Sequence, residues 1–178
     1  DFRKKYQIEN KFIILGVASS WAPRKGLDVF VKLAEDLPEE YQIVIVGIDE
    51  REKNKLPETI ISITRTNNQK ELAEIYSVAD VFVNPTREEN FPTTNIEALA
   101  CGTGVITYRT GGSPEIIDQE TGVVVEKDNY DELKQAIFKV KKDGTFSKEK
   151  CRNRSMKYSR DERYKEYVEL FESILEGR

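Results

Sequence analysis

The stretch Glu89-Asn-Phe-Pro-Thr-Thr-Asn-Ile-Glu97, followed by Ala98-Leu-Ala-Cys-Gly102, places two carboxylates around a turn that leads into a helix. The apolar residues after the turn have helical spacing, and a glycine suits the position just past a helix end. The first N–H groups of a helix have no partner within it and carry part of its dipole. A diphosphate can therefore dock there, beside the hydroxyls of Thr93 and Thr94.

The rest of the chain alternates between short strands and helices. Runs rich in Val and Ile are typical of buried strands, and stripes with a period of 3.6 residues are typical of helices. We expect strands at 12–17, 41–46, 60–64, 81–83, 105–108 and 122–125, and the main helices near 27–37, 68–79, 93–100, 130–142, 148–158 and 161–175. This pattern predicts an α/β fold: a doubly wound, Rossmann-like parallel sheet of about six strands, with helices on both faces and a helical C-terminus.

The length of 178 residues suits one domain. Residues 1–10 are polar and read as a linker rather than a structural element, so the domain is expected to span residues 11–178. A net charge of −4 argues against nucleic acid as a partner. The chain has no histidine, so a general base would have to be a carboxylate, a lysine, the substrate or a group on another domain.

The cysteines and the apolar runs of the sequence indicate in which cellular compartment the protein resides. It has two cysteines fifty positions apart, Cys101 and Cys151, which fit neither a disulfide framework nor a zinc pattern, and both are expected to be buried, reduced thiols. The longest apolar runs are strand-sized, and no N-terminal stretch resembles a signal peptide. We therefore expect a cytoplasmic protein.

Ligands of doubly wound sheets bind outside the carboxyl ends of the strands. In the expected sheet that edge carries the loops at 19–26, 65–67, 84–92 and 109–114. Every motif singled out here lies on one of these loops or directly after it.

Four motifs together resemble a known family. They are Glu89-x7-Glu97, its Ala-Leu-Ala-Cys-Gly tail, Gly111-Gly-Ser-Pro-Glu115 and Arg24-Lys25-Gly26. The chain resembles the nucleotide-binding half of the family 4 retaining glycosyltransferases, which have the GT-B fold. This resemblance implies a domain that binds a nucleoside-diphosphate sugar and, with a preceding domain that holds the acceptor, transfers the sugar with retention at the anomeric carbon.

The resemblance assigns different roles to the two glutamates. Glu97 would bind the ribose hydroxyls, since one carboxylate can accept hydrogen bonds from both hydroxyls of a cis-diol. Glu89 is the catalytic candidate, facing the donor sugar and orienting its hydroxyls or supporting positive charge at the anomeric carbon. The alternatives are a solvated acid near a helix start for Glu97 and a turn-shaping residue for Glu89.

The resemblance also implies a phosphate-binding lysine. Lys25 would neutralise the diphosphate leaving group. The family usually pairs this lysine with an arginine six residues earlier, where this sequence has Ser19, so one positive charge of the expected clamp is missing. Arg24 is the candidate substitute, although an exposed arginine beside a lysine is as often solvated.

The remaining candidates carry weaker signals. The glycines Gly111 and Gly112 either present N–H groups to the donor or form a tight turn. In the family, Arg65 and Thr66 fall where backbone contacts to the nucleobase are made. Phe91 is kept as a substrate-binding candidate, although, as for Trp21, packing of the loops is the favoured interpretation for an aromatic residue beside a short turn.

The leading hypothesis is a hexosyltransferase domain without a cofactor. It is also expected to need no metal, because no Asp-x-Asp pair stands on a suitable loop. Its partners would be the nucleotide sugar and, through the missing domain, an acceptor glycan or lipid-linked sugar. The alternatives are a noncatalytic nucleotide-sugar-binding module, or a sugar-nucleotide epimerase or phosphorylase of the same architecture. Membrane contact is left open, and the missing domain could hold the protein at the inner face of a membrane. Without that domain the chain is expected to be inactive.

Overall fold

The computed structural model describes residues 2–177 and contains one six-stranded sheet. Its order is β3-β2-β1-β4-β5-β6, and every neighbouring pair is parallel. The strands are β1 (Phe12–Val17), β2 (Tyr41–Val46), β3 (Ile61–Ile63), β4 (Val81–Asn84), β5 (Val105–Tyr108) and β6 (Gly122–Val125). The predicted doubly wound α/β fold is confirmed, and the strand order reverses between β1 and β4.

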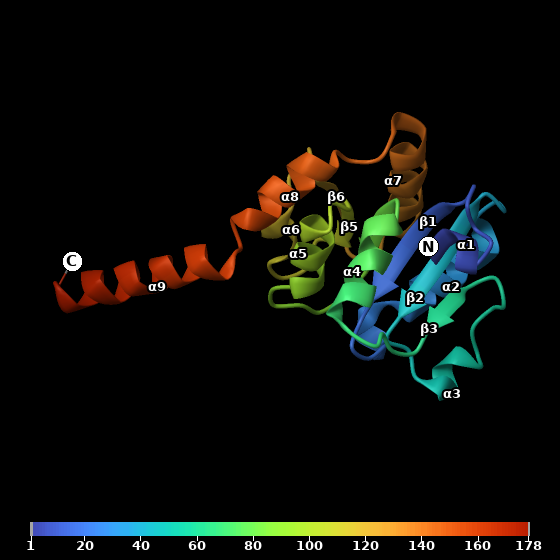
Figure 1. Ribbon diagram of the computed structural model, residues 1–178, viewed down its shortest axis with the longest axis horizontal. Coiled ribbons are helices and arrows are strands. Elements are labelled where there is room, and N and C mark those ends of the chain that lie inside the picture. The colour runs from blue at the N-terminus through green and yellow to red at the C-terminus, as the bar shows by residue number, and fades with distance from the viewer. Residues whose placement is uncertain (1, 178) are drawn as a thin grey trace.

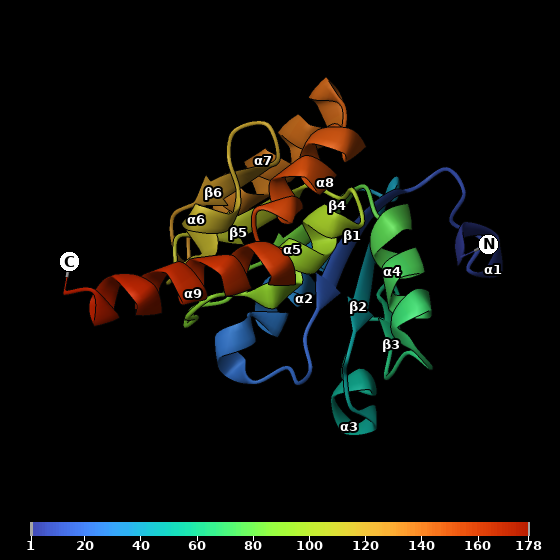
Figure 2. The ribbon, with the colours of Figure 1, turned by 60° about the vertical axis from the view of Figure 1, so that its left-hand side comes forward.

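Helices cover both faces of the sheet (Figures 1 and 2). Alternate strand residues point to opposite faces, so Ile14 packs in one core and Ile13 and Leu15 in the other. The first core includes residues of α2 (Leu27–Asp36) and α7 (Tyr130–Asp143). The second takes in residues of the helices α4 (Gln69–Val78), α5 (Thr93–Ala100), α6 (Ser113–Ile116) and α8 (Lys148–Met156).

The sequence led us to expect a linker over residues 1–10, but the structure shows ordered elements within residues 2–10. These residues contain α1 (Phe2–Lys5), and Ile8 is buried as part of the second core. Arg3 ties this segment to the sheet by donating to the carbonyl of Lys11 and to Asp80 Oδ2, each at 2.8 Å. The polar composition concealed this role because Arg3 contributes hydrogen bonds rather than apolar area.

Two other short elements complete the connections, η1 (Pro23–Lys25) after β1 and α3 (Glu50–Lys53) after β2. Both thiols are free, as expected. Cys151, a residue of α8, is buried, but Cys101 at the end of α5 is only partly buried, so the prediction of two buried thiols is wrong for Cys101.

The last helix, α9 (Arg160–Leu175), extends away from the rest of the domain (Figure 1). Its large apolar side chains are between 53% and 87% exposed: Tyr164, Tyr167, Val168, Leu170, Phe171, Ile174 and Leu175. Within residues 2–177, neither this helix nor any other has the length and apolar character needed to cross a membrane.

We predict that Asp80→Ala destabilises the domain, because Asp80 Oδ2 accepts from the Ile13 N–H at 2.7 Å as well as from Arg3. Leaving that N–H without its acceptor should lower the free energy of unfolding by about 1–3 kcal/mol in urea denaturation. Glu39→Ala removes an exposed carboxylate and serves as the control. Equal stability of the two variants would contradict the assignment.

Candidate active site

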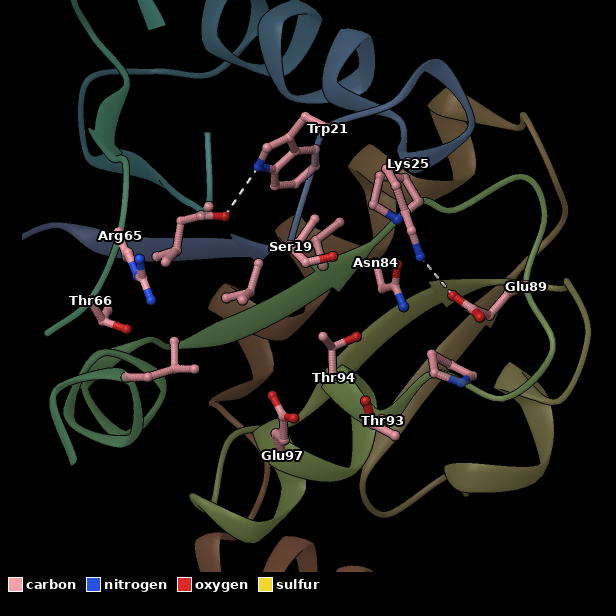
Figure 3. A pocket seen from close by; sticks show the side chains of 18 of the residues that line it. Ser19, Trp21, Lys25, Arg65, Thr66, Asn84, Glu89, Thr93, Thr94 and Glu97 are labelled. Atoms are coloured by element: carbon pink, nitrogen blue, oxygen red, sulfur yellow. Dashed lines mark hydrogen bonds and ion pairs between the residues drawn. The ribbon is translucent and has the colours of Figure 1, made fainter. Parts of the chain in front are cut away.

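A cavity of about 580 Å³ opens where the strand order reverses, at the carboxyl ends of β1 and β4. At such a point the loops that follow the two adjacent parallel strands run in opposite directions, which leaves room for a ligand between them. Most of the predicted site residues line the cavity, and all of these except Phe91 are labelled in Figure 3: Ser19, Lys25, Arg65, Thr66, Glu89, Phe91, Thr93, Thr94 and Glu97. The structure thus brings predicted residues that follow β1, β3 and β4 together around one cavity.

Lys25 and Glu89 form an ion pair at the edge of this cavity, with 2.8 Å between Nζ and Oε2 (Figure 3). Lys25 ends the short helix η1, and Gly26 follows with a φ of 75° that turns the chain directly into α2. The pair joins the loop after β1 to the loop after β4. It also means that the cationic and the catalytic candidate neutralise each other.

The start of α5 faces the same cavity through Thr93 and Thr94. Pro92 is its N-cap, and no side chain caps the first turn. The partial positive charge of the helix end is therefore available to an anion.

Glu97 lies one turn into α5 and accepts a hydrogen bond from the Tyr76 hydroxyl at 3.1 Å. Burial is the main cause that raises the pKa of Tyr76 far above its usual value, and the Glu97 carboxylate adds to it. Tyr76 therefore stays protonated and donates at any pH near neutrality. Tyr76 was expected only as part of a helical stripe, so its orienting role was missed.

The glycine pair supports the loop that carries Glu89 and does not reach the cavity within the described structure. Gly112 donates its N–H to the carbonyl of Asn90 at 2.7 Å. Gly111 has a φ of 48°, and a Cβ there would meet the Glu89 carbonyl oxygen at 1.8 Å. The tight-turn interpretation of Gly111 and Gly112 is thus the one that this geometry favours.

Arg24 also lies outside the described cavity lining and donates to the carbonyl of Glu88 at 3.2 Å. A stronger tie comes from Arg87, which was not singled out in the sequence. It pairs with Asp28 at 2.7 Å and with Asp128 at 2.6 Å. The Arg87 guanidinium holds the pKa of Asp28 below its usual value. These pairs fix the far side of the loop that bears Glu89.

The aromatic candidates differ from each other. Trp21 is buried, donates from Nε1 to the Val46 carbonyl at 3.1 Å and packs edge-on against Phe30, while one side of it lines the cavity. Phe91 is 41% exposed at the rim, with its ring 5.6 Å from that of Tyr158.

Further cavity residues were not predicted, among them Asn84, Gly47, Thr64 and Leu72. All lie at strand ends or at a helix start, where only the assembled sheet reveals their proximity. Across residues 2–177, no three side chains of the Cys, Asp or Glu type gather in a metal-binding cluster.

The sequence matches the family "Glycosyl transferases group 1" over residues 1–162. The chain belongs to this family. It is 27% identical over 92% of its length to alpha-galactosylglucosyldiacylglycerol synthase of Streptococcus pneumoniae, and 30% identical over 71% to D-inositol 3-phosphate glycosyltransferase of Mycobacteroides abscessus. It spans 46% and 32% of those relatives, so it corresponds to less than half of each.

Solved structures agree on the fold of this group 1 glycosyltransferase chain. Sucrose-phosphate synthase from Thermosynechococcus elongatus superposes with a TM-score of 0.80 at 23% identity, covering 99% of this chain and 49% of the other. HepE of Anabaena in complex with UDP-glucose gives 0.74 at 17% identity, covering 87% and 46%.

We predict opposite effects from removing the two partners of the ion pair in this glycosyltransferase domain. Glu89→Gln should raise the affinity for inorganic pyrophosphate by about threefold to tenfold, because Lys25 is released to meet an anion, and Lys25→Ala should lower it. Calorimetry at low and high salt measures both, with smaller differences at high salt. Glu88→Gln removes the same charge from the exposed neighbour and is the control; if it matches Glu89→Gln, the pair does not govern anion binding.

Proposed function

We propose that this chain is the donor-binding, C-terminal half of a family 4 retaining GT-B glycosyltransferase that transfers a sugar from a nucleoside-diphosphate sugar to an acceptor. The observation that carries the proposal is the convergence of Lys25, Glu89, Glu97 and the α5 N-terminus on one cavity at the β1–β4 reversal. Family membership and the solved complexes of HepE with UDP and UDP-glucose support it.

In the proposed complex each group acts on a different part of the donor. The diphosphate sits against the α5 N-terminus, where Thr93 and Thr94 offer N–H and hydroxyl groups, with Lys25 as the counter-charge. Glu97, held by Tyr76, accepts from the ribose hydroxyls. The base lies toward Arg65 and Thr66 at the end of β3, on the side of the cavity away from Glu89 (Figure 3).

The proposed catalytic group is Glu89. When the diphosphate draws Lys25 away, the Glu89 carboxylate becomes free to orient the donor sugar and to stabilise positive charge at its anomeric carbon. The leaving diphosphate is stabilised by Lys25 and the helix end, so the proposed reaction needs neither metal nor cofactor. Retention at the anomeric carbon is part of the proposal, as are an acceptor glycan or lipid-linked sugar and a cytoplasmic location at or near a membrane.

The acceptor side is assigned to the part of the relatives that this chain does not span. Without an opposing wall the chain does not hold an acceptor hydroxyl for attack, and such positioning accounts for roughly 7–11 kcal/mol of a barrier. The exposed apolar side chains of α9 form the surface against which we expect that part to pack. The chain alone should therefore bind donor without turning it over.

Ligand-observed NMR with the diphosphates and diphosphate sugars of uridine, guanosine and adenosine tests the proposal. At least one should bind, and Glu97→Gln should weaken the nucleoside and its diphosphate alike by about tenfold, since both carry the ribose. Glu74→Gln, on the exposed side of α4, is the control. No binding at millimolar concentration would favour a module of another function. Multiple turnover by the chain alone would refute its assignment as one half of an enzyme, and the anomer formed by the complete protein reports on retention.

We further predict that Ser19→Arg strengthens nucleoside-diphosphate binding. The cavity lining carries Lys25 and Arg65 against Glu89 and Glu97, so it has no excess of positive charge for a diphosphate. The Ser19→Arg substitution would supply this excess positive charge. Calorimetry should show an increase in nucleoside-diphosphate affinity of about threefold to tenfold. Ser20→Arg adds the same charge at an exposed position outside the described lining. An equal gain from both variants would show only a general charge effect.

A further inference from the structure

Two buried amides meet behind the cavity. Asn84 is the last residue of β4, only 8% exposed, and it lines the cavity between Lys25 and Thr94 (Figure 3). Asn95 lies in the first turn of α5 and is 0% exposed. Asn84 Nδ2 donates to Asn95 Oδ1 at 2.8 Å. Asparagine is depleted in strands and costly to bury, so this pair needs a reason beyond packing.

The pair as it stands leaves two groups without partners. Asn95 Nδ2 is buried and has no acceptor within the described structure. Asn84 Oδ1 accepts no hydrogen bond from residues 2–177 either, although Asn84 borders the cavity. A carbonyl oxygen is an unfavourable neighbour for a phosphate, because both are acceptors.

Turning both amides over removes this conflict. Asn95 Nδ2 would then donate to Asn84 Oδ1 across the same gap, and the Asn84 NH₂ group would take the place of its oxygen. The buried NH₂ of Asn95 gains an acceptor, while its carbonyl takes the unpartnered position, which carbonyl oxygens tolerate better than N–H groups do. The exchange needs only rotation of two side-chain amides.

We propose that Asn84 is a diphosphate-binding residue and that Asn95 is the positioning residue that lets its NH₂ group turn to the ligand. The inference rests on the proposed function, since it takes a nucleoside diphosphate as occupant. In the turned-over arrangement the Asn84 NH₂ group donates a charge-assisted hydrogen bond to a phosphate oxygen, which stabilises that arrangement. Asn84 thereby adds a donor to a cavity whose loop after β1 offers Ser19 rather than a second cation.

Calorimetry with UDP and uridine tests the role of Asn84. Asn84→Leu should weaken UDP on the order of tenfold and leave uridine unchanged, because the lost bond is to phosphate. The double variant Asn84→Leu/Asn95→Leu replaces both partners by apolar side chains of similar size, which restores stability. Its UDP affinity should remain as low as that of Asn84→Leu, although its stability is restored. Asn153→Leu, on the exposed side of α8, is the matched control. UDP affinity of the double variant equal to that of the unmodified chain would overturn the proposal.

The unmodified protein provides a second readout if the variants fold poorly. On addition of UDP the side-chain NH₂ resonances of Asn84 and Asn95 should both shift, and those of Asn84 should exchange more slowly with water. Uridine should produce neither change. Bound UDP with unmoved NH₂ resonances refutes the turning amides, whereas no binding of any nucleoside diphosphate refutes the proposed function instead.

Discussion

The reversal of strand order between β1 and β4 sets where the cavity forms and which loops line it. Crossover helices on one side of this point run to one face of the sheet, and those beyond it run to the other, so the loops after β1 and β4 diverge. The cavity is the space between them. The sequence places Lys25 on the first loop and Glu89 on the second, and their ion pair spans the crevice.

The loop that carries Glu89 is held mainly by groups that never touch the cavity. Thr110 donates to the Thr86 carbonyl at 2.9 Å, the Arg87 N–H donates to the Arg24 carbonyl at 2.7 Å, and Gly111 allows the Glu89 backbone to approach closely. Backbone contacts of this kind fix the position of a carboxylate without competing for its charge. Glu89 is thereby oriented by its surroundings and restrained by Lys25 alone among the described basic side chains.

The positive and negative side chains that line the cavity are equal in number. Two basic and two acidic side chains line it, and the uncapped start of α5 supplies the remaining positive potential. Under the proposed function, a diphosphate that enters this cavity would replace Glu89 as the partner of Lys25. The buried amides of Asn84 and Asn95 can likewise change partners, because a side-chain amide presents a donor or an acceptor depending on its rotation.

Sequence patterns were sufficient to predict the fold class, nearly all of the strands and the main helices, because apolar periodicity and turn residues act over a few neighbouring positions. They also located Lys25, Glu89, Glu97 and the start of α5 on one edge, since parallel strands share a direction. Other features were decided only by tertiary structure. The role of Arg3 at the sheet, the support given by Arg87, and the Asn84–Asn95 pair join residues at least eight positions apart and up to 77. No local pattern records such contacts, because they form only when the sheet brings distant strand ends together.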